Sequence, residues 1–169
     1  MTDDAPELFL CPDEEQFRTV LGHFATGVTI ITAMDSDEPV GVSANSFTSV
    51  SLDPPLVLFC VAKSSTTWPR IERARRFAVN ILADHQEEVC KVFATRGIDR
   101  FAQVAWHAGV SGSPILEDVL AYVDCVMDAE HEAGDHLIVV GRVLDVAVTS
   151  EGGPLLFHRG NYFSFSPDQ

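Results

Sequence analysis

Two short segments concentrate side chains that can bind a polar ligand. The first, residues 41–51, reads Gly-Val-Ser-Ala-Asn-Ser-Phe-Thr-Ser-Val-Ser and is dense in hydroxyl and amide groups. Such groups, together with backbone N–H groups, can hydrogen-bond the polar edge of a ring or a phosphate. A solvent-exposed turn rich in Ser and Asn has the same composition, so this segment alone leaves both interpretations open.

The second segment, residues 63–67 (Lys-Ser-Ser-Thr-Thr), lies between an apolar run and the start of an expected helix. Free N–H groups and the positive end of the helix dipole meet there, and Lys63 adds a charge, which is typical of an anion site. Helix capping alone needs only one of these hydroxyls. Their excess favours a phosphate as the ligand.

Charged side chains elsewhere suggest further contacts. His136 follows Gly134 and Asp135 in an expected turn, where an imidazole can hydrogen-bond a carboxamide or manage a proton, although a lone surface histidine usually has no such role. Arg96 and Arg100 follow an expected helix. Arginines in that place can clamp a cofactor or a partner subunit, or they can form surface ion pairs.

Several other chemistries lack their sequence motif. No H-E-x-x-H or C-x-x-C occurs and the four cysteines have no metal-ligand spacing, so no metal site is expected. The chain also lacks G-x-S-x-G, G-x-G-x-x-G and the P-loop pattern. Hydrolase, Rossmann and P-loop chemistries are therefore not indicated.

Length and charge describe a globular chain of one domain, residues 1–169, with residues 1–12 as a loose N-terminal arm. A net charge of −14 repels nucleic acid and anionic membranes, so neither is expected as a partner, and an anionic ligand needs a local site. The acidic N-terminus is unlike a signal peptide, and no apolar run approaches the roughly 20 residues of a membrane span. Since isolated cysteines also fit a reducing compartment, we expect a cytoplasmic protein.

Hydrophobic patterning predicts the order of helices and strands. Asp13 caps a first helix, with Gln16 at the third position, and Gly27 ends it. Its apolar face is formed by Phe17, Val20, Leu21 and Phe24. Further helices are expected after residues 64–67 and over 84–95, the second with Asp84 and Glu87 as its cap. Strands are expected at 28–34, 40–44, 56–62 (buried on both faces), 77–82, 121–128, 137–148 (with a bulge or bend at Gly141) and 162–165.

These seven strands do not alternate regularly with helices, which argues against a doubly wound sheet. We expect a mainly β fold with short helices, built as an antiparallel barrel with helices packed at its ends.

Taken together, six segments resemble one known family, the flavin reductase-like domain. They are residues 21–29, 43–56, 77–80, 100–101, 134–136 and 160–162, and the resemblance extends from about residue 17 to residue 165. The long match at 43–56 (Ser-Ala-Asn-Ser-Phe-Thr-Ser-Val-Ser-Leu-Asp-Pro-Pro-Leu) is specific, whereas Gly-Asp-His alone would be weak.

The resemblance implies an FMN-binding split β-barrel that forms a homodimer with FMN or FAD at the subunit interface. In the best-known branch of the family, the protein is the small reductase component of a two-component flavin monooxygenase. NADH or NADPH reduces the flavin, which then leaves for a separate oxygenase component. The sequence does not distinguish FMN, FAD and riboflavin, or NADH and NADPH.

The resemblance also assigns expected roles to individual residues. Ser43, Ala44, Asn45 and Ser46 are expected along the isoalloxazine and ribityl chain. Residues expected near ribityl or phosphate oxygens are Ser49, Ser51, Lys63, Ser64, Ser65 and Thr66, and Ala62 is also expected to bind the cofactor. Phe93 and Arg100 would approach the flavin, His136 would face the nicotinamide, and Tyr162 would lie nearby.

The implied reaction is hydride transfer from nicotinamide C4 to flavin N5, in which the cofactors carry the chemistry and the protein orients them. Because hydride transfer needs no base, His136 is expected to position the carboxamide. A phosphate-binding site that consists of Ser and Thr side chains with one lysine predicts a loosely held flavin. Two alternatives stay open: a flavin-binding module, carrier or sensor, without reductase activity, and a protein that keeps its flavin and reduces another small molecule.

Overall fold

The computed structural model describes residues 12–165. Apart from residue 12, the predicted N-terminal arm lies outside the described residues, as does Cys11. The remaining three cysteines, Cys60, Cys90 and Cys125, are free thiols.

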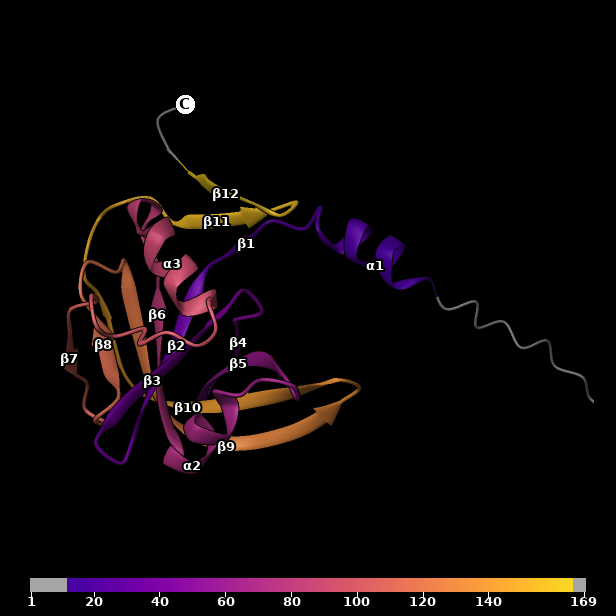
Figure 1. The fold of residues 1–169 in the computed structure, drawn as a ribbon. Helices are drawn as coiled ribbons and strands as arrows, with labels where there is room; N and C mark the ends of the chain where they lie inside the picture. Colours follow the sequence, from indigo (N-terminus) through magenta and orange to yellow (C-terminus); the bar gives the residue numbers. More distant parts are fainter. Residues whose placement is uncertain (1–11, 166–169) are drawn as a thin grey trace, which may run out of the picture.

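Seven antiparallel strands form one curled sheet that carries most of the core (Figure 1). Their spatial order is β3 (Glu38–Ala44), β2 (Thr29–Asp35), β6 (Arg76–Ile81), β9 (Ala121–Ala133), β10 (His136–Val148), β5 (Pro55–Ala62) and β4 (Thr48–Leu52). The edge strands β3 and β4 are neighbours in sequence but do not pair, so the barrel stays split between them. The predicted mainly β fold is confirmed.

Smaller elements cover the ends of this sheet. A three-stranded sheet contains β1 (Thr26–Gly27), β11 (Leu155–His158) and β12 (Asn161–Ser164), and a two-stranded sheet contains β7 (Trp106–Ala108) and β8 (Pro114–Leu116). The helical elements are α1 (Glu14–Leu21), α2 (Trp68–Ala74), η1 (Asp84–Gln86) and α3 (Glu87–Ala94). In Figure 1, α3 lies beneath the three-stranded sheet, whereas α2 lies at the opposite end of the barrel.

The two helices that flank the barrel each seal one hydrophobic cluster. Trp68 of α2 packs edge-on against Phe59, which in turn meets Phe77 edge-on at 5.3 Å between ring centroids. Cys90 and Phe93 of α3 belong to the second cluster. Apolar burial of this extent is the main stabilising contribution in a domain of this size.

The expected bulge at Gly141 is confirmed, and its cause is steric. The pairing of β10 with β9 shifts register between Val140 and Gly141. A Cβ atom on Gly141 would collide with the ring of Phe77. The missing side chain therefore lets β10 pass over a fully buried phenylalanine.

Several predicted boundaries are wrong for local reasons. The first helix ends at Leu21, not Gly27, because the chain then enters β1. The strand at 56–62 buries alternate residues fully and leaves the others half-buried, so it is not buried on both faces. The cap before α3 uses Gln86, whose side chain accepts from the backbone N–H of Ala83 at 3.0 Å, rather than Asp84 with Glu87.

Five short strands escaped the hydrophobic pattern: β1, β4, β7, β8 and β11. All five have only two to five residues, too few for a period of two to stand out. β4 was interpreted as part of a polar segment because it is rich in Ser and Thr, yet it pairs with β5 along the open edge of the barrel.

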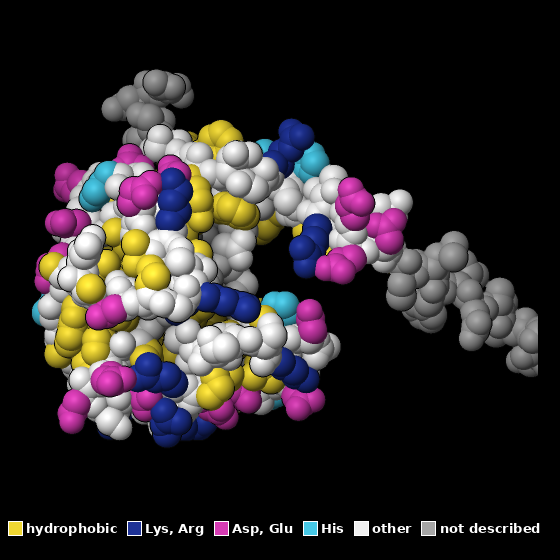
Figure 2. Space-filling model, viewed as in Figure 1, with side chains coloured by type: hydrophobic (Ala, Val, Ile, Leu, Met, Phe, Trp, Pro, Cys, Tyr) yellow, Lys and Arg dark blue, Asp and Glu magenta, His cyan; other side chains and the backbone are white. Residues whose placement is uncertain are grey.

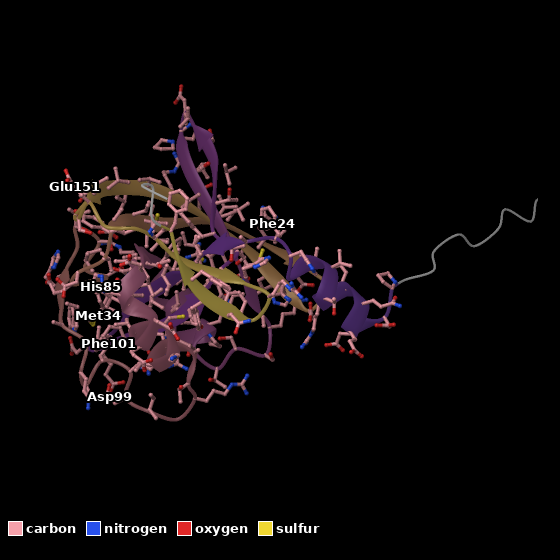
Figure 3. All side chains as sticks on the ribbon, turned by 90° about the horizontal axis from the view of Figure 1, so that it is seen from above. Phe24, Met34, His85, Asp99, Phe101 and Glu151 are labelled. Carbon is pink, nitrogen blue, oxygen red and sulfur yellow. The ribbon has the colours of Figure 1, made fainter. Side chains whose placement is uncertain are left out.

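Helix α1 stands away from the rest of the chain, and none of its residues is buried (Figure 1). The predicted cap is present, since the Asp13 carboxylate accepts from the backbone N–H of Gln16 at 2.7 Å. The predicted apolar face is also present, but it is open to solvent: Phe17 is 53% exposed and Phe24 is 75% exposed. Figure 3 shows Phe24 on the segment that joins α1 to the barrel. Among residues 12–165, no helix has the length and apolarity needed to cross a membrane.

An ion-pair cluster joins the β2–β3 hairpin to α2. The Asp35 carboxylate, only 8% exposed, accepts from Arg70 Nε at 2.7 Å and from Arg73 Nη2 at 2.6 Å. Hydrogen bonds from Arg73 and then Arg70 lower the pKa of Asp35 from 3.8 to about 2. Arg70 also donates to Glu38, which is 77% exposed, at 2.6 Å.

We predict that Asp35→Asn lowers the melting temperature at neutral pH, because the variant lacks the charge that pairs with both arginines. A depressed carboxyl pKa stabilises the folded state above the unfolded pKa of 3.8, and this stabilisation is lost as the pH falls toward about 2. Melting curves between pH 2 and 7 should therefore converge at the acidic end. Glu38→Gln, at the exposed end of the cluster, is the matched control and should change little. Equal melting temperatures for Asp35→Asn and wild type at pH 7 would contradict the assignment.

Candidate functional site

A cleft of about 380 Å³ opens where the end of β3, strand β5, residues 63–67 and the end of α3 meet. Figure 2 shows the molecule hollowed on this side, with acidic side chains spread over the surrounding surface and basic side chains beside the hollow. Eleven of the residues expected at the site line the cleft: Ser43, Ala44, Asn45, Ser46, Ala62, Ser64, Ser65, Thr66, Phe93, Arg100 and His136.

The turn from β3 to β4 forms one wall and is pinned by Ser46. Its hydroxyl accepts from the backbone N–H of Cys60 at 2.8 Å and donates to the carbonyl of the same residue at 3.1 Å. This side chain therefore continues the pairing of β4 with β5 by one step beyond the end of β4. Ser43 and Asn45 hydrogen-bond no other side chain or backbone group of the described chain through their own side chains, so both are available to a ligand.

Residues 63–67 form a second wall with spare hydrogen-bond donors. Ser65 provides the helix cap, because its hydroxyl accepts from the backbone N–H of Trp68 at 3.2 Å. Within residues 12–165, the hydroxyls of Ser64 and Thr66 and the backbone N–H groups of Ser64, Thr66 and Thr67 have no partner. Unpaired N–H groups in a bend of this kind favour an anion.

Two arginines bring positive charge to the cleft. Arg100 Nη1 donates to the Gly41 carbonyl at 2.6 Å and to the Thr67 hydroxyl at 2.9 Å, while its Nε and Nη2 donate to the Thr95 carbonyl. Burial, and then the charge of Arg96, lower the pKa of Arg100. Neither arginine pairs with a carboxylate of the described chain, so the surface ion pairs considered from sequence are not found there.

His136 begins β10 at the rim of the cleft, opposite Ala62. Its Nδ1 lies 2.7 Å from Asp135 Oδ1, and this hydrogen bond is the main reason why the pKa of Asp135 is lowered. Because an ionised carboxylate only accepts, Nδ1 of His136 is the donor. A neutral imidazole then presents Nε2 as an acceptor, which suits an amide N–H group.

Four predicted residues lie outside the cleft. Ser49 and Ser51 are on β4, and Lys63 points to Glu132, with 3.3 Å between Nζ and Oε2. Tyr162 lines a smaller pocket of about 150 Å³, which shares the wall formed by Ser43. Burial, with a hydrogen bond to Cys90 Sγ at 3.2 Å, raises the pKa of Tyr162 to about 12, so its phenol stays protonated at neutral pH.

Other cleft residues were not assigned to the site from the sequence. They are Val42, Phe59, Cys60, Val61, Ala94 and Arg96, while Thr67 belongs to the segment 63–67 but had no role of its own. The β5 residues look like ordinary core in the sequence, and only the split of the barrel exposes their edge. Arg96 carried a signal, since it follows α3 near Arg100, but the sequence did not decide between a cofactor clamp and an ion pair. The cations that line the cleft are therefore Arg96 and Arg100 rather than Lys63. The expectation of a loosely held flavin counted one lysine as the charged donor, and the two arginines change that count.

The cleft combines an apolar wall, formed by half-buried residues such as Val42, Ala44 and Ala62, with unpaired N–H groups and unbalanced arginines at one end. A planar ring system with an anionic tail is complementary to this arrangement, because the ring is desolvated on the wall while the tail accepts from the donors. The residues present therefore fit a flavin nucleotide.

Comparison with protein-family models agrees with this chemistry. Residues 21–166 match the family described as "Flavin reductase like domain". The chain belongs to the flavin reductase-like domain family, as its sequence resemblance indicated.

Individual relatives carry more specific names. The chain is 48% identical over 157 residues to HsaB, the reductase subunit of a flavin-dependent monooxygenase from Rhodococcus jostii (strain RHA1), with 93% of this chain and 80% of that protein covered. It is similar in structure to a homologue of nitrilotriacetate monooxygenase component B from Mycobacterium thermoresistibile (TM-score 0.90, 45% identity, 93% and 89% of the chains covered). It is also similar to the NADH:FAD oxidoreductase SgcE6 of Streptomyces globisporus in complex with NAD and FAD fragments (TM-score 0.87, 40% identity, 92% and 94% covered).

We predict that Ser46→Ala destabilises the protein whereas Ser43→Ala does not. The first change leaves the N–H group of Cys60 without its partner, at a cost of roughly 1–3 kcal/mol, and each kcal/mol lowers the melting temperature of a domain of this size by about 2–4 °C. The second removes a hydroxyl that no described residue binds. Thermal melts of both variants without ligand test this, and equal melting temperatures would refute the pinning role of Ser46.

Proposed function

We propose that this protein is an NAD(P)H:flavin oxidoreductase that reduces FMN or FAD and supplies the reduced flavin to a separate monooxygenase. The observation that carries the proposal is the cleft, in which an apolar wall ends at unpaired N–H groups and two unbalanced arginines. Membership of the flavin reductase-like domain family supports the same reaction, and its relatives include reductase subunits of monooxygenases.

The residues that would hold the flavin divide into two groups. Ala44 and Ala62 contribute apolar surface to the ring, with Ser43 and Asn45 as polar partners at its edge. Phe93 also lines the cleft, but it is fully buried and supports the wall from beneath. The tail would be held by Ser64, Thr66 and Arg100, with Ser65 fixing the shape of this wall through its cap. Ser46 acts on the site indirectly, by holding the β3–β4 turn against β5.

When bound, the flavin supplies the hydride acceptor for a reduced nicotinamide. The protein's contribution is to bring the two rings together in a water-poor cleft. His136 is suited to orienting the nicotinamide, since Asp135 fixes its ring and leaves Nε2 free to accept from a carboxamide N–H. NADH as donor is supported by relatives named for that reaction, SgcE6 and the NADH-dependent FMN reductase SmoA of Agrobacterium fabrum (strain C58 / ATCC 33970).

The same proposal includes a homodimer. The apolar face of α1 borders a groove of about 820 Å³ that is lined mostly by apolar surface and reaches Phe47 and Phe157 on the barrel. On β10, Leu144, Val146 and Val148 are also exposed. Apolar patches this extensive on one chain are typical of a permanent interface, and a second copy would bury them.

The remaining parts of the proposal concern organisation and location. We regard residues 1–169 as a single flavin reductase-like domain, with residues 1–12 as its N-terminal arm. We place the protein in the cytoplasm, where the free thiols of Cys60, Cys90 and Cys125 would stay reduced. Ser49, Ser51, Lys63 and Tyr162 stay in the proposed cofactor environment as residues around the cleft.

We predict that purified protein oxidises NADH or NADPH, followed at 340 nm, only when FMN, FAD or riboflavin is added, and that the rate saturates with flavin. In the same assay, His136→Ala should raise the KM for the nicotinamide cofactor or lower kcat, because the carboxamide loses its acceptor. Unchanged kinetics would remove His136 from this role. Flavin binding without turnover for any flavin would instead favour a binding module without reductase activity.

We predict that the protein is a dimer at micromolar concentration and that replacing Phe17 and Phe24 together by Ser shifts it toward monomer. Both rings lie on surface that we expect the second copy to cover. Size-exclusion chromatography with light scattering gives the mass directly. Glu15→Ser on the same helix is the control and should leave the dimer intact. A monomeric wild type, or a double variant that is still fully dimeric, would contradict the interface.

A further inference from the structure

One buried hydrogen bond has no part in the proposed flavin contacts. Cys90 Sγ of α3 lies 3.2 Å from the phenol oxygen of Tyr162 in β12. The two elements meet where α3 lies beneath the three-stranded sheet (Figure 1). Cys90 is only 3% exposed and Tyr162 is half-buried, so the thiol meets the phenol rather than water.

Both groups of this pair are neutral at neutral pH. Burial raises the pKa of the Cys90 thiol above its usual 9.0. Burial, and then the hydrogen bond to Cys90, raise the pKa of Tyr162 to about 12. Because a thiol is only a weak donor, the Tyr162 hydroxyl is the donor in this contact and Sγ is the acceptor. The lone pairs of the phenol oxygen therefore remain available as acceptors.

The phenol borders a pocket of about 150 Å³ that adjoins the flavin cleft. Ser43, Ala44 and Asn45 line both the pocket and the cleft, so this segment is their common wall. The proposed function assigns the same three residues to the flavin ring and its edge. An acceptor in the pocket therefore lies beside the wall on which the ring is expected to bind.

A fixed acceptor in this pocket suits the edge of a flavin ring. Val28 and Phe157 contribute apolar surface, and the side chains of Ser43 and Asn45 have no partner in the described chain. The oxidised isoalloxazine ring carries one N–H group, at N3, which needs an acceptor once water is excluded. An acceptor that is already oriented loses less rotational freedom on binding than one that the ligand must order.

We propose that Cys90 is a positioning residue for flavin recognition: its thiol accepts from the Tyr162 hydroxyl and turns the phenol oxygen, as an acceptor, toward the ring edge bound at Ser43 and Asn45. The proposal rests on the proposed function, because it concerns the same flavin site. Cys90 acts only through Tyr162. This gives the phenol a role in binding the ring rather than in hydride transfer.

Dissociation constants for riboflavin and FMN, measured by flavin fluorescence, test this role without turnover. Tyr162→Phe removes the acceptor and Cys90→Ala leaves its direction unfixed, so each should raise both constants by about fivefold, as the loss of one hydrogen bond does. Cys90→Ser should stay near wild type, because a serine hydroxyl also accepts from a phenol. The rise should be equal for both flavins, since riboflavin has the same ring without the phosphate.

A double variant separates positioning from packing. If Cys90 acts through the phenol, Cys90→Ala adds no further rise in a Tyr162→Phe background. Melting temperatures do not make this distinction, because a smaller side chain at a buried position lowers them in any case. Cys125→Ala is the matched control. Cys125 is a fully buried free thiol in the other hydrophobic cluster, so this variant should melt lower but leave both dissociation constants unchanged.

Unchanged constants in Tyr162→Phe would overturn the proposal, even if Cys90→Ala did not fold. An equal rise for Cys90→Ala in the wild-type and Tyr162→Phe backgrounds would also overturn it, because packing alone would then explain the effect. A rise for FMN without one for riboflavin would place the effect at the phosphate, with the same consequence. Failure of the proposed function is separate: the wild type would bind flavin but oxidise neither NADH nor NADPH, while the dissociation constants would still report on Cys90.

Discussion

The guanidinium of Arg100 holds together the parts of the chain on which the site depends. It donates to the Thr95 carbonyl just after α3, to the Gly41 carbonyl in β3 and to the Thr67 hydroxyl before α2. These segments are far apart in sequence and form three walls of the cleft. Because its partners are neutral oxygens, Arg100 fixes the walls without losing its charge to a carboxylate. The same group thus shapes the cleft and keeps a positive charge that favours an anionic ligand there.

This arrangement reconciles an acidic protein with an anionic ligand. The net charge of −14 opposes the approach of phosphates over most of the surface. Within the cleft, however, Arg96 and Arg100 have no carboxylate partner in the described chain, and nearby N–H groups are unpaired. Short-range donors in a partly desolvated cleft outweigh a screened field from distant surface charges. Arg70 and Arg73, by contrast, are neutralised locally by Asp35.

The split in the barrel is equally important for the chemistry. A closed barrel would pair β3 with β4, and no cleft would open between them. Instead, β3 and β4 stay unpaired, and two hydrogen bonds of Ser46 to Cys60 hold the turn between them against β5. The apolar face of α1 is also left open, since no other part of residues 12–165 covers its side chains.

The sequence by itself determined much of the local structure. Alternating or continuous apolar runs placed β2, β3, β5, β6, β9 and β10, Asp13 placed the start of α1, and Gly141 marked a bulge. Residue types and the family resemblance predicted that the hydroxyl-rich segments at 43–46 and 64–66 bind a ligand, and the structure brings both to one cleft. These features depend on neighbours in the chain, which a sequence displays directly.

Only the tertiary structure decided which of these groups meet. It separated Ser46 and Ser65, whose hydroxyls hold backbone N–H groups, from Ser43, Ser64 and Thr66, which keep theirs free. It placed Lys63 beside Glu132 and gave the cationic role to Arg96 and Arg100. It also left the apolar face of α1, which the periodicity predicted, uncovered by the rest of residues 12–165. Such outcomes depend on the partners that distant segments bring within about 3 Å, and hydrogen bonding is too short-ranged for residue type alone to specify them.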